Sequence, residues 1–134
     1  MKVFLDTNIL ISAMLFQSSM PAKAYFKAVT GDNEGIICDQ NIDELRRVFN
    51  RKFPDKLQAL ESFLSVSLLS LTVVRVPINT TDDESKVRDV FDRPILRAAK
   101  NAGADVFVTG DKDFLESGIT DPMIITAAQF VDMP

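Results

Sequence analysis

Histidine is absent from this chain of 134 residues, and so are the catalytic arrangements that depend on it. No Ser-His-Asp triad, Cys-His pair or histidine proton shuttle can form. Zinc sites that need histidine ligands are excluded as well. Acid–base or metal chemistry therefore has to come mainly from carboxylates, and oxygen-only ligand sets favour Mg²⁺, Mn²⁺ or Ca²⁺.

Cysteine is nearly absent too, since Cys38 is the only one, and it predicts a small core residue rather than a disulfide. No apolar run has the length of a membrane span, so we expect no membrane partner. No signal peptide pattern is present either, because strand character begins at Val3 and a charge follows at Asp6. The length and the 46% hydrophobic content fit a single folded domain over residues 1–134, which we expect to be cytoplasmic.

The net charge is −4, and a simple electrostatic argument then disfavours nucleic acid as a partner. Net charge is a coarse measure, however. If several acids converge on bound divalent cations, the charge that a phosphodiester meets at the site is locally reversed. A nucleic-acid substrate therefore stays open at this point.

Short apolar runs alternate with helical patterns along the whole chain. The alternation predicts an α/β fold, a Rossmann-like three-layer α/β/α sandwich around a central parallel sheet. Buried strands are expected over residues 2–6, 36–38, 72–76, 104–109 and 122–126. Among the helices, we expect one over 9–16, one over 54–70 and a short closing helix over 127–131, with a polar loop over 78–84.

Acidic residues stand where strands end or helices begin. Asp6 and Asp111 follow the first and fourth strands, Glu44 lies early in the helix after the second strand, and Asp92 opens a later helix. In a parallel sheet these junctions meet at one edge, where ligands bind. Carboxylates gathered there repel one another unless they are protonated or bridged by cations. A divalent metal resolves that repulsion and supplies a Lewis acid.

Each of these residues also has a plain structural interpretation. Asp6 and Asp92 fit helix N-caps, and Glu44 fits a surface glutamate in an intrahelical pair. The helix that carries Glu44 also carries four basic residues, which fit either a solvated face or a surface that binds the phosphate backbone of a nucleic acid. These residues are Arg46, Arg47, Arg51 and Lys52.

Four motifs stand in order along the chain: VFLDTN at residues 3–8, DELRRV at 43–48, RDVFDRPIL at 88–96 and GADVFVTGDKD at 103–113. Together they resemble the four motifs of PIN-domain ribonucleases, in the branch of VapC-like toxins of toxin–antitoxin systems. The resemblance covers essentially the whole chain, as a single PIN domain. It implies metal-dependent endonucleolytic cleavage of RNA around Mg²⁺ or Mn²⁺, with an acidic quartet that binds the metal: Asp6, Glu44, Asp92 and Asp111.

Further residues match positions of the same family. Asn8 and Thr109 match polar residues that orient the metal ligands, and Asp113 matches a position that assists them in part of the family. Asp89 also falls on a motif position. Arg93 stands where this branch often has another acid, so its cation either weakens metal binding or meets the substrate phosphate.

The resemblance also implies an RNA substrate, a cognate antitoxin protein and a homodimer. One alternative is a catalytically inactive PIN-like module that binds RNA or a partner. A haloacid-dehalogenase-type phosphatase would need an acid at position 8, where this chain has Asn8. A dinucleotide-binding enzyme is disfavoured because no Gly-x-Gly-x-x-Gly follows the first strand.

Overall fold

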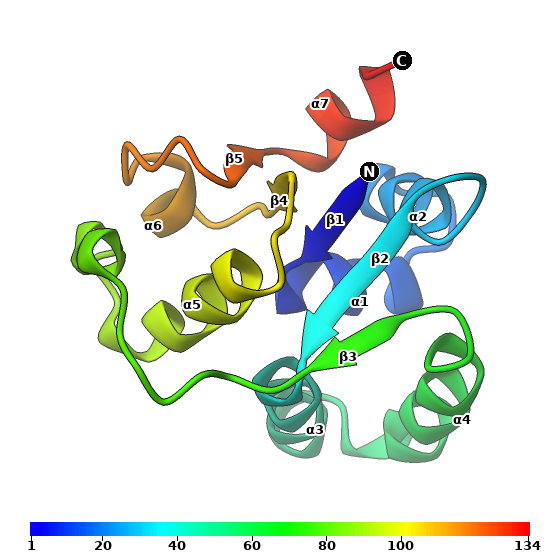
Figure 1. Ribbon diagram of the computed structural model, residues 1–134. Coiled ribbons are helices and arrows are strands. Elements are labelled where there is room, and N and C mark those ends of the chain that lie inside the picture. Colours follow the sequence, from blue (N-terminus) through cyan, green and yellow to red (C-terminus); the bar gives the residue numbers. More distant parts are fainter.

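Five parallel strands form one sheet in the computed structural model, which describes residues 1–134 (Figure 1). Their order across the sheet is β3-β2-β1-β4-β5, and every neighbouring pair is parallel, as the sequence predicts. The strands are β1 (Lys2–Leu5), β2 (Glu34–Cys38), β3 (Thr72–Val74), β4 (Val106–Val108) and β5 (Met123–Ile125).

The first strand lies at the centre of the sheet. Phe4 pairs with Ile36 of β2 on one side and with Phe107 of β4 on the other. The chain runs from β1 outward through β2 to β3, and the connection from β3 to β4 then crosses to the other side of β1, so the strand order switches between β1 and β4. In open α/β sheets the crevice at such a switch point, at the carboxyl ends of the strands, is where ligands bind. Asp6 directly follows β1 at that end.

Seven helices and three short 3₁₀ turns connect the strands. The strand ends and the end of the closing helix differ from the sequence prediction by one or two residues, and two helices differ in ways that have a local cause. The first helix begins at Thr7 rather than residue 9, because Asp6 already caps it. The helix predicted over 54–70 is a 3₁₀ turn followed by a shorter helix. The elements are α1 (Thr7–Leu15), α2 (Met20–Ala28), α3 (Asp39–Lys52), η1 (Pro54–Lys56), α4 (Leu57–Ser67), η2 (Asp82–Lys86), η3 (Val90–Asp92), α5 (Arg93–Asn101), α6 (Lys112–Leu115) and α7 (Ala127–Asp132).

Two hydrophobic cores lie on opposite faces of the sheet, which completes the predicted three layers. Val3 and Leu5 pack on one face with residues of α1, α2, α3, α4 and α7. Phe4 points to the other face, against α5 and α6, where its ring stacks on Phe107 at 5.3 Å between centroids. Cys38 is fully buried in this second core, as predicted, and burial raises the pKa of its thiol to about 12. No helix is both long enough and apolar enough to span a membrane.

The segment from residue 75 to residue 92 links β3 to α5, and we call it the linking segment. Part of it was predicted as a loop over 78–84, but η2 occupies residues 82–86. It is fastened to α5 by Arg97, whose guanidinium pairs with Glu84 at 2.9 Å and donates to the carbonyl of Pro77 at 2.9 Å. Both charged side chains of this pair are largely buried. These two contacts of Arg97 hold the linking segment, which carries Asp89 and Asp92, near the carboxyl ends of the strands.

Candidate metal centre

Asp6 is buried at the end of β1, and both of its carboxylate oxygens accept hydrogen bonds. Oδ1 accepts from the backbone N–H of Thr7 at 2.8 Å, which is its N-cap role, and Oδ2 accepts from the hydroxyl of Thr109 at 2.7 Å. Burial raises the pKa of Asp6 to about 6. The charges of Glu44 and Asp111 raise it further, whereas the two hydrogen bonds act in the opposite direction. The N-cap interpretation is therefore correct but accounts for only one of the two oxygens.

Asp111 lies at the end of β4, beside Asp6, and caps α6. Its Oδ1 accepts from the backbone N–H of Asp113 at 2.9 Å. Its own N–H donates to Thr109 Oγ1 at 3.0 Å, so the hydroxyl hydrogen of Thr109 is free to point at Asp6. The amide oxygen of Asn8 lies 3.5 Å from the N–H of Gly110. Thr109 thus orients a predicted metal ligand directly, while Asn8 braces the turn that presents Asp111.

Glu44 reaches the same edge of the sheet from α3 through a chain of hydrogen bonds that begins at the backbone. The N–H of Cys38 donates to Asn41 Oδ1 at 2.8 Å, which fixes the orientation of that amide. Asn41 Nδ2 donates to Thr7 Oγ1 at 2.8 Å, and the Thr7 hydroxyl donates to Glu44 Oε2 at 2.8 Å. The second oxygen of Glu44 accepts from Gln40 Nε2 at 3.2 Å. Asn41 is completely buried, and sequence reasoning missed both it and Thr7.

Asp92 occupies the N-cap position of α5, but its carboxylate makes no capping hydrogen bond. Burial of this half-buried side chain is the main cause that raises its pKa to about 7. Four other acids add to the shift in the order Asp6, Asp89, Asp111 and Glu44. Because Asp6, Asp111 and Glu44 each raise the pKa of Asp92, the other three predicted ligands lie close enough to interact electrostatically with it.

A different trio is the most closely spaced. Asp89, Asp92 and Asp113 each present an oxygen within 4.8 Å of the others, and no three members of the predicted quartet do so. In the trio, the charge of Asp113 is partly balanced by Arg88, whose Nε lies 3.0 Å from its carboxylate. Asp92 is thus the residue that the two groups share.

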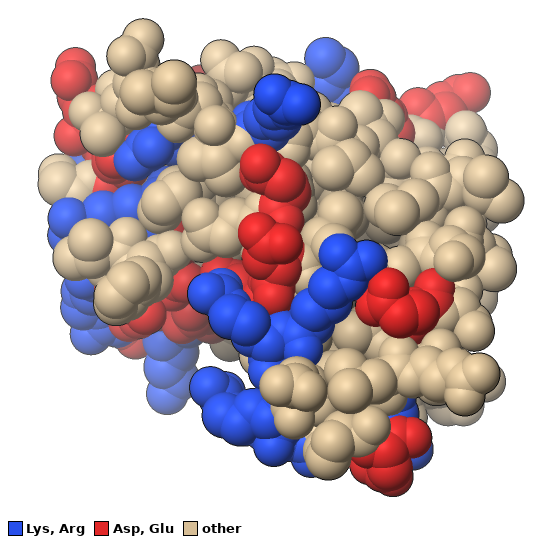
Figure 2. All heavy atoms as spheres, turned by 90° about the horizontal axis from the view of Figure 1, so that it is seen from below, with Lys and Arg blue, Asp and Glu red and all other residues tan.

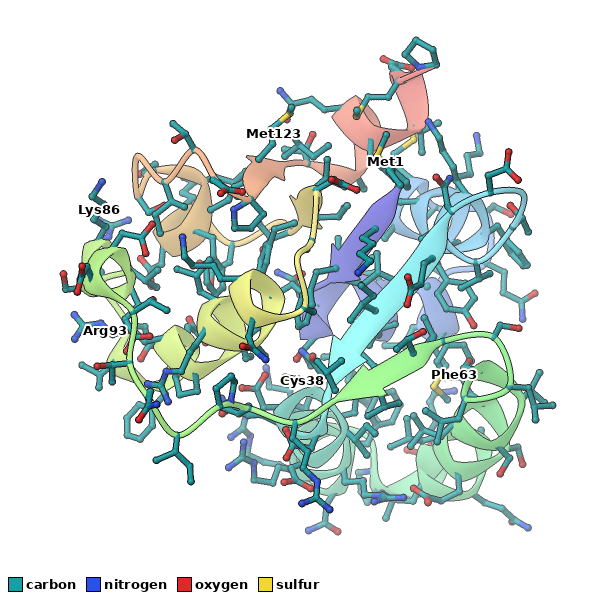
Figure 3. All side chains as sticks on the ribbon, viewed as in Figure 1. Met1, Cys38, Phe63, Lys86, Arg93 and Met123 are labelled. Atoms are coloured by element: carbon teal, nitrogen blue, oxygen red, sulfur yellow. The ribbon has the colours of Figure 1, made fainter.

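None of the four predicted ligands forms an ion pair with a lysine or arginine. Arg93, the cation nearest to Asp92 in sequence, donates instead to the backbone carbonyls of Val87 at 2.9 Å and Ser85 at 3.4 Å. In Figure 3, Arg93 at the start of α5 lies well apart from Cys38 at the end of β2. Arg93 therefore stabilises the linking segment rather than neutralising the acidic site.

The four basic residues of α3 are all exposed, but they do not act alike. Arg46 pairs with Glu61 of α4 at 2.9 Å, whereas Arg47 borders a cleft next to Glu44. Arg51 and Lys52 lie in the last turn of α3. Figure 2, which views the molecule from below, shows a row of acidic side chains across that face with lysine and arginine side chains beside it.

The cleft beside Glu44 is an open hollow of about 520 Å³ between α3 and the linking segment. Sequence reasoning did not anticipate it. Two large apolar side chains on its rim are exposed, Phe91 by 82% and Val90 by 62%. The residues that line it are Asp39, Gln40, Asp43, Glu44, Arg47, Val76, Val90, Phe91 and Pro94.

The donor set of the acidic site suits a hard divalent cation. The carboxylates of Asp6, Glu44, Asp92 and Asp111 offer only oxygen atoms, which are the ligands that Mg²⁺ and Mn²⁺ prefer. No basic side chain competes for them. The raised pKa values of Asp6 and Asp92 show that their negative charges are under-compensated by the protein alone. A bound cation would remove that electrostatic strain.

Comparison with known proteins identifies the family and a solved structure with the same fold. A family model described as PIN domain matches residues 2–113, so the chain belongs to the PIN-domain family, whose members are generally nucleases. The PIN-domain family that the four motifs indicate is thereby confirmed. One chain in the crystal structure of VapBC2 from Rickettsia felis, bound to a DNA fragment from their promoter, has the same fold. It is 18% identical, the match covers 94% of this chain and 98% of that chain, and the TM-score is 0.71. No curated protein sequence matches the chain.

Proposed function

We propose that the protein is a metal-dependent endoribonuclease that hydrolyses RNA phosphodiester bonds, as the toxin of a toxin–antitoxin pair. The observation that carries this proposal is the environment of the Asp92 carboxylate. Its half-buried carboxylate caps no helix, pairs with no cation and faces four other acids. A residue with only a structural role would lack a reason for such an environment. Membership of the PIN-domain family supports the nuclease class.

Asp6, Glu44, Asp92 and Asp111 are the residues that would hold Mg²⁺ or Mn²⁺, with Asp113 and Asp89 close enough to assist. When bound, such a cation lowers the pKa of water and neutralises the charge that develops on the phosphoryl and leaving oxygens. The donor set of the four acids fits this role, because it contains only oxygen atoms.

The remaining residues prepare the site for that task. Thr109 holds one oxygen of Asp6, and Thr7 holds one oxygen of Glu44, through single hydrogen bonds of 2.7 and 2.8 Å. Each carboxylate keeps lone pairs on both oxygens for a ligand, since a carboxylate accepts about four hydrogen bonds or metal contacts. Fixing their orientation beforehand reduces the reorganisation that accompanies phosphodiester hydrolysis.

The RNA backbone is expected to approach along α3. Arg47 lies next to Glu44 in the cleft, and Arg51 and Lys52 extend the positive surface toward the end of the helix. Phosphate contacts of this kind position a strand without reading its sequence. Arg46 is committed to Glu61 and Arg93 to backbone carbonyls, so we assign both a smaller part in RNA binding than the sequence suggests.

An antitoxin partner and a homodimer belong to the same proposal. The similarity of fold to a chain of the VapBC2 complex supports the first of these. Affinity purification from the native host through a tag on this chain, followed by mass spectrometry, tests for the partner. Size-exclusion chromatography with light scattering tests for the dimer.

The experiment that tests the activity is cleavage of a mixed panel of RNAs by purified protein in Mn²⁺, in Mg²⁺ and in EDTA. Asp6→Asn, prepared identically, serves as the control for contaminating nucleases. We expect cleavage that needs the divalent cation and disappears in the variant. RNA binding without cleavage, and without Mn²⁺ binding by calorimetry, would instead favour a catalytically inactive binding module.

A further inference from the structure

We propose that the cleft between α3 and the linking segment is a nucleobase pocket, which binds an unpaired base of single-stranded RNA next to the cleaved phosphate. This inference rests on the proposed ribonuclease function and narrows its substrate class. It concerns the 520 Å³ hollow bordered by Glu44, Arg47 and Phe91. That volume lies within the roughly 300–1,000 Å³ typical of small-molecule sites.

The cleft has one polar wall and one apolar wall, as a pocket for a flat heteroaromatic ring requires. Gln40, Glu44 and Arg47 form the polar wall, and their spacing of four and three residues places them along one face of α3. Val76 and Phe91 belong to the opposite, mainly apolar wall. A base can therefore contact an apolar surface with its ring while its edge meets hydrogen-bonding groups.

Phe91 is the most informative residue of the apolar wall. Phe91 is 82% exposed although the protein buries most of its other phenylalanines. Its neighbour Val90 is 62% exposed, so the apolar patch continues along the rim of the cleft. An aromatic ring beside a charged groove is the arrangement with which proteins stack unpaired bases, and such stacking tolerates any base.

The cleft is connected to the acidic site by Glu44, which belongs to both, and by the side chain of Gln40. Gln40 Nε2 donates to the backbone carbonyl of Phe91 at 2.8 Å and to Glu44 Oε1 at 3.2 Å. The same amide therefore holds the wall that carries the exposed ring and one of the proposed metal ligands. A base in the cleft would lie beside Glu44, and the phosphate attached to its nucleotide would lie within reach of the acids.

Arg47 completes the pocket. It is exposed on the polar wall and has no ion-pair partner, unlike Arg46 beside it. Its guanidinium can cover the second face of a base or contact the adjoining phosphate. The acidic neighbours Asp39 and Asp43 make the cleft unsuited to a bare phosphate. This charge pattern favours the base rather than the backbone as the group that enters the hollow.

A fluorescence titration tests this directly, because the chain contains no tryptophan. Phe91→Trp places the sole indole in the cleft, and Phe26→Trp places it at a similarly exposed position on α2, outside the cleft. Both are made with Asp6→Asn to prevent cleavage and titrated with a short unstructured RNA in Mn²⁺. We expect quenching of the indole at position 91 only. Equal quenching at both positions, or none at position 91, would overturn the pocket.

Cleavage kinetics separate this proposal from the activity itself. For Phe91→Ala we expect KM for single-stranded RNA to rise about tenfold with kcat little changed, whereas Phe26→Ala, outside the cleft, stays near wild type. If the wild type cleaves RNA and Phe91→Ala has the same KM, the pocket is wrong and the nuclease stands. If the wild type cleaves nothing, the nuclease proposal fails, and the fluorescence titration still decides whether the cleft binds bases.

Discussion

The Thr109 hydroxyl donates to Asp6 Oδ2 across 2.7 Å, and the backbone N–H of Asp111 holds it in that direction by donating to its oxygen at 3.0 Å. Thr7 repeats this arrangement. Its oxygen accepts from Asn41 and its hydroxyl donates to Glu44. Two of the four proposed metal ligands are therefore oriented by threonine hydroxyl groups. Each hydroxyl is itself oriented by a hydrogen bond, from the Asp111 N–H for Thr109 and from the Asn41 amide for Thr7.

Removing the Thr109 hydroxyl should damage the site more than the fold. For Thr109→Val we expect Mn²⁺ affinity or kcat/KM to fall by about 10- to 100-fold, the usual effect of losing a group that orients a metal ligand. Thr109→Ser keeps the hydroxyl and should retain most of the activity. Calorimetric Mn²⁺ binding and cleavage rates measure both variants. Wild-type binding and rate in Thr109→Val would contradict the orienting role.

Asn41 should matter for stability as well as for the site. Asn41→Ala leaves the buried N–H of Cys38 without an acceptor and releases the Thr7 hydroxyl. We expect the free energy of unfolding to fall by about 1–3 kcal/mol, the effect of an unsatisfied buried polar group. Asn50→Ala, on the exposed side of the same helix, is the matched control and should change it by less than about 0.5 kcal/mol. Urea unfolding of both variants provides the comparison, and equal stabilities would refute this role.

The metal-free protein should lose stability as the pH rises. The pKa of Asp6 is raised from 3.8 to about 6 in the folded state, so between these values the folded chain binds more protons than the unfolded chain. The free energy of unfolding therefore falls from about pH 4 to pH 7, by on the order of 3 kcal/mol for this group. The pKa of Asp92 is about 7, so this residue extends the pH range over which stability is lost to higher pH.

The variant Asp6→Asn isolates that contribution. Measured in EDTA, it should gain stability relative to the wild type as the pH rises from 4 to 7.5. A stability difference between the two proteins that stays constant with pH would show that Asp6 is not electrostatically strained. Adding Mn²⁺ at pH 7.5 should raise the melting temperature of the wild type more than that of the variant.

The Arg97–Glu84 pair should be worth far more than the Arg46–Glu61 pair at a similar distance. The first is largely buried and the second is half exposed. Arg97→Met leaves Glu84 buried without its partner, so we expect a loss of about 3–5 kcal/mol. Arg46→Met should lose far less stability, since exposed pairs contribute little. Similar losses in denaturant unfolding would contradict this account of how the linking segment is fastened.

Much of the fold could be predicted because the sequence signals are local. The apolar run of β1 is buried on both faces of the sheet, so it reads as a central parallel strand. Asp6 and Asp111 end buried strands, and the topology of a parallel sheet then brings those ends to one edge. Helix ends were less certain: Asp6 is itself the cap, so α1 begins two residues earlier than its apolar pattern indicates.

The finer features of the site depend on contacts between distant segments. Asn41 and Thr7 are 34 residues apart, and only the packing of α3 against α1 joins them. The spacing Cys38-x-x-Asn41 at a strand–helix junction is a capping-box pattern, the one local signal that could have indicated the contact between Cys38 and Asn41. No local pattern indicates that Arg93 turns to backbone carbonyls, or that Phe91 remains exposed beside Glu44.

The measurement that tests the central claim most directly is RNA cleavage by Asp92→Asn beside the wild type and Asp55→Asn, each in Mn²⁺ and in EDTA. Asp55 is an exposed aspartate of η1 and is not one of the proposed ligands. Circular dichroism first establishes that all three proteins are folded. We predict Mn²⁺-dependent cleavage by the wild type and Asp55→Asn, and its loss in Asp92→Asn. Undiminished cleavage by folded Asp92→Asn would contradict the assignment of this uncapped carboxylate to the metal centre.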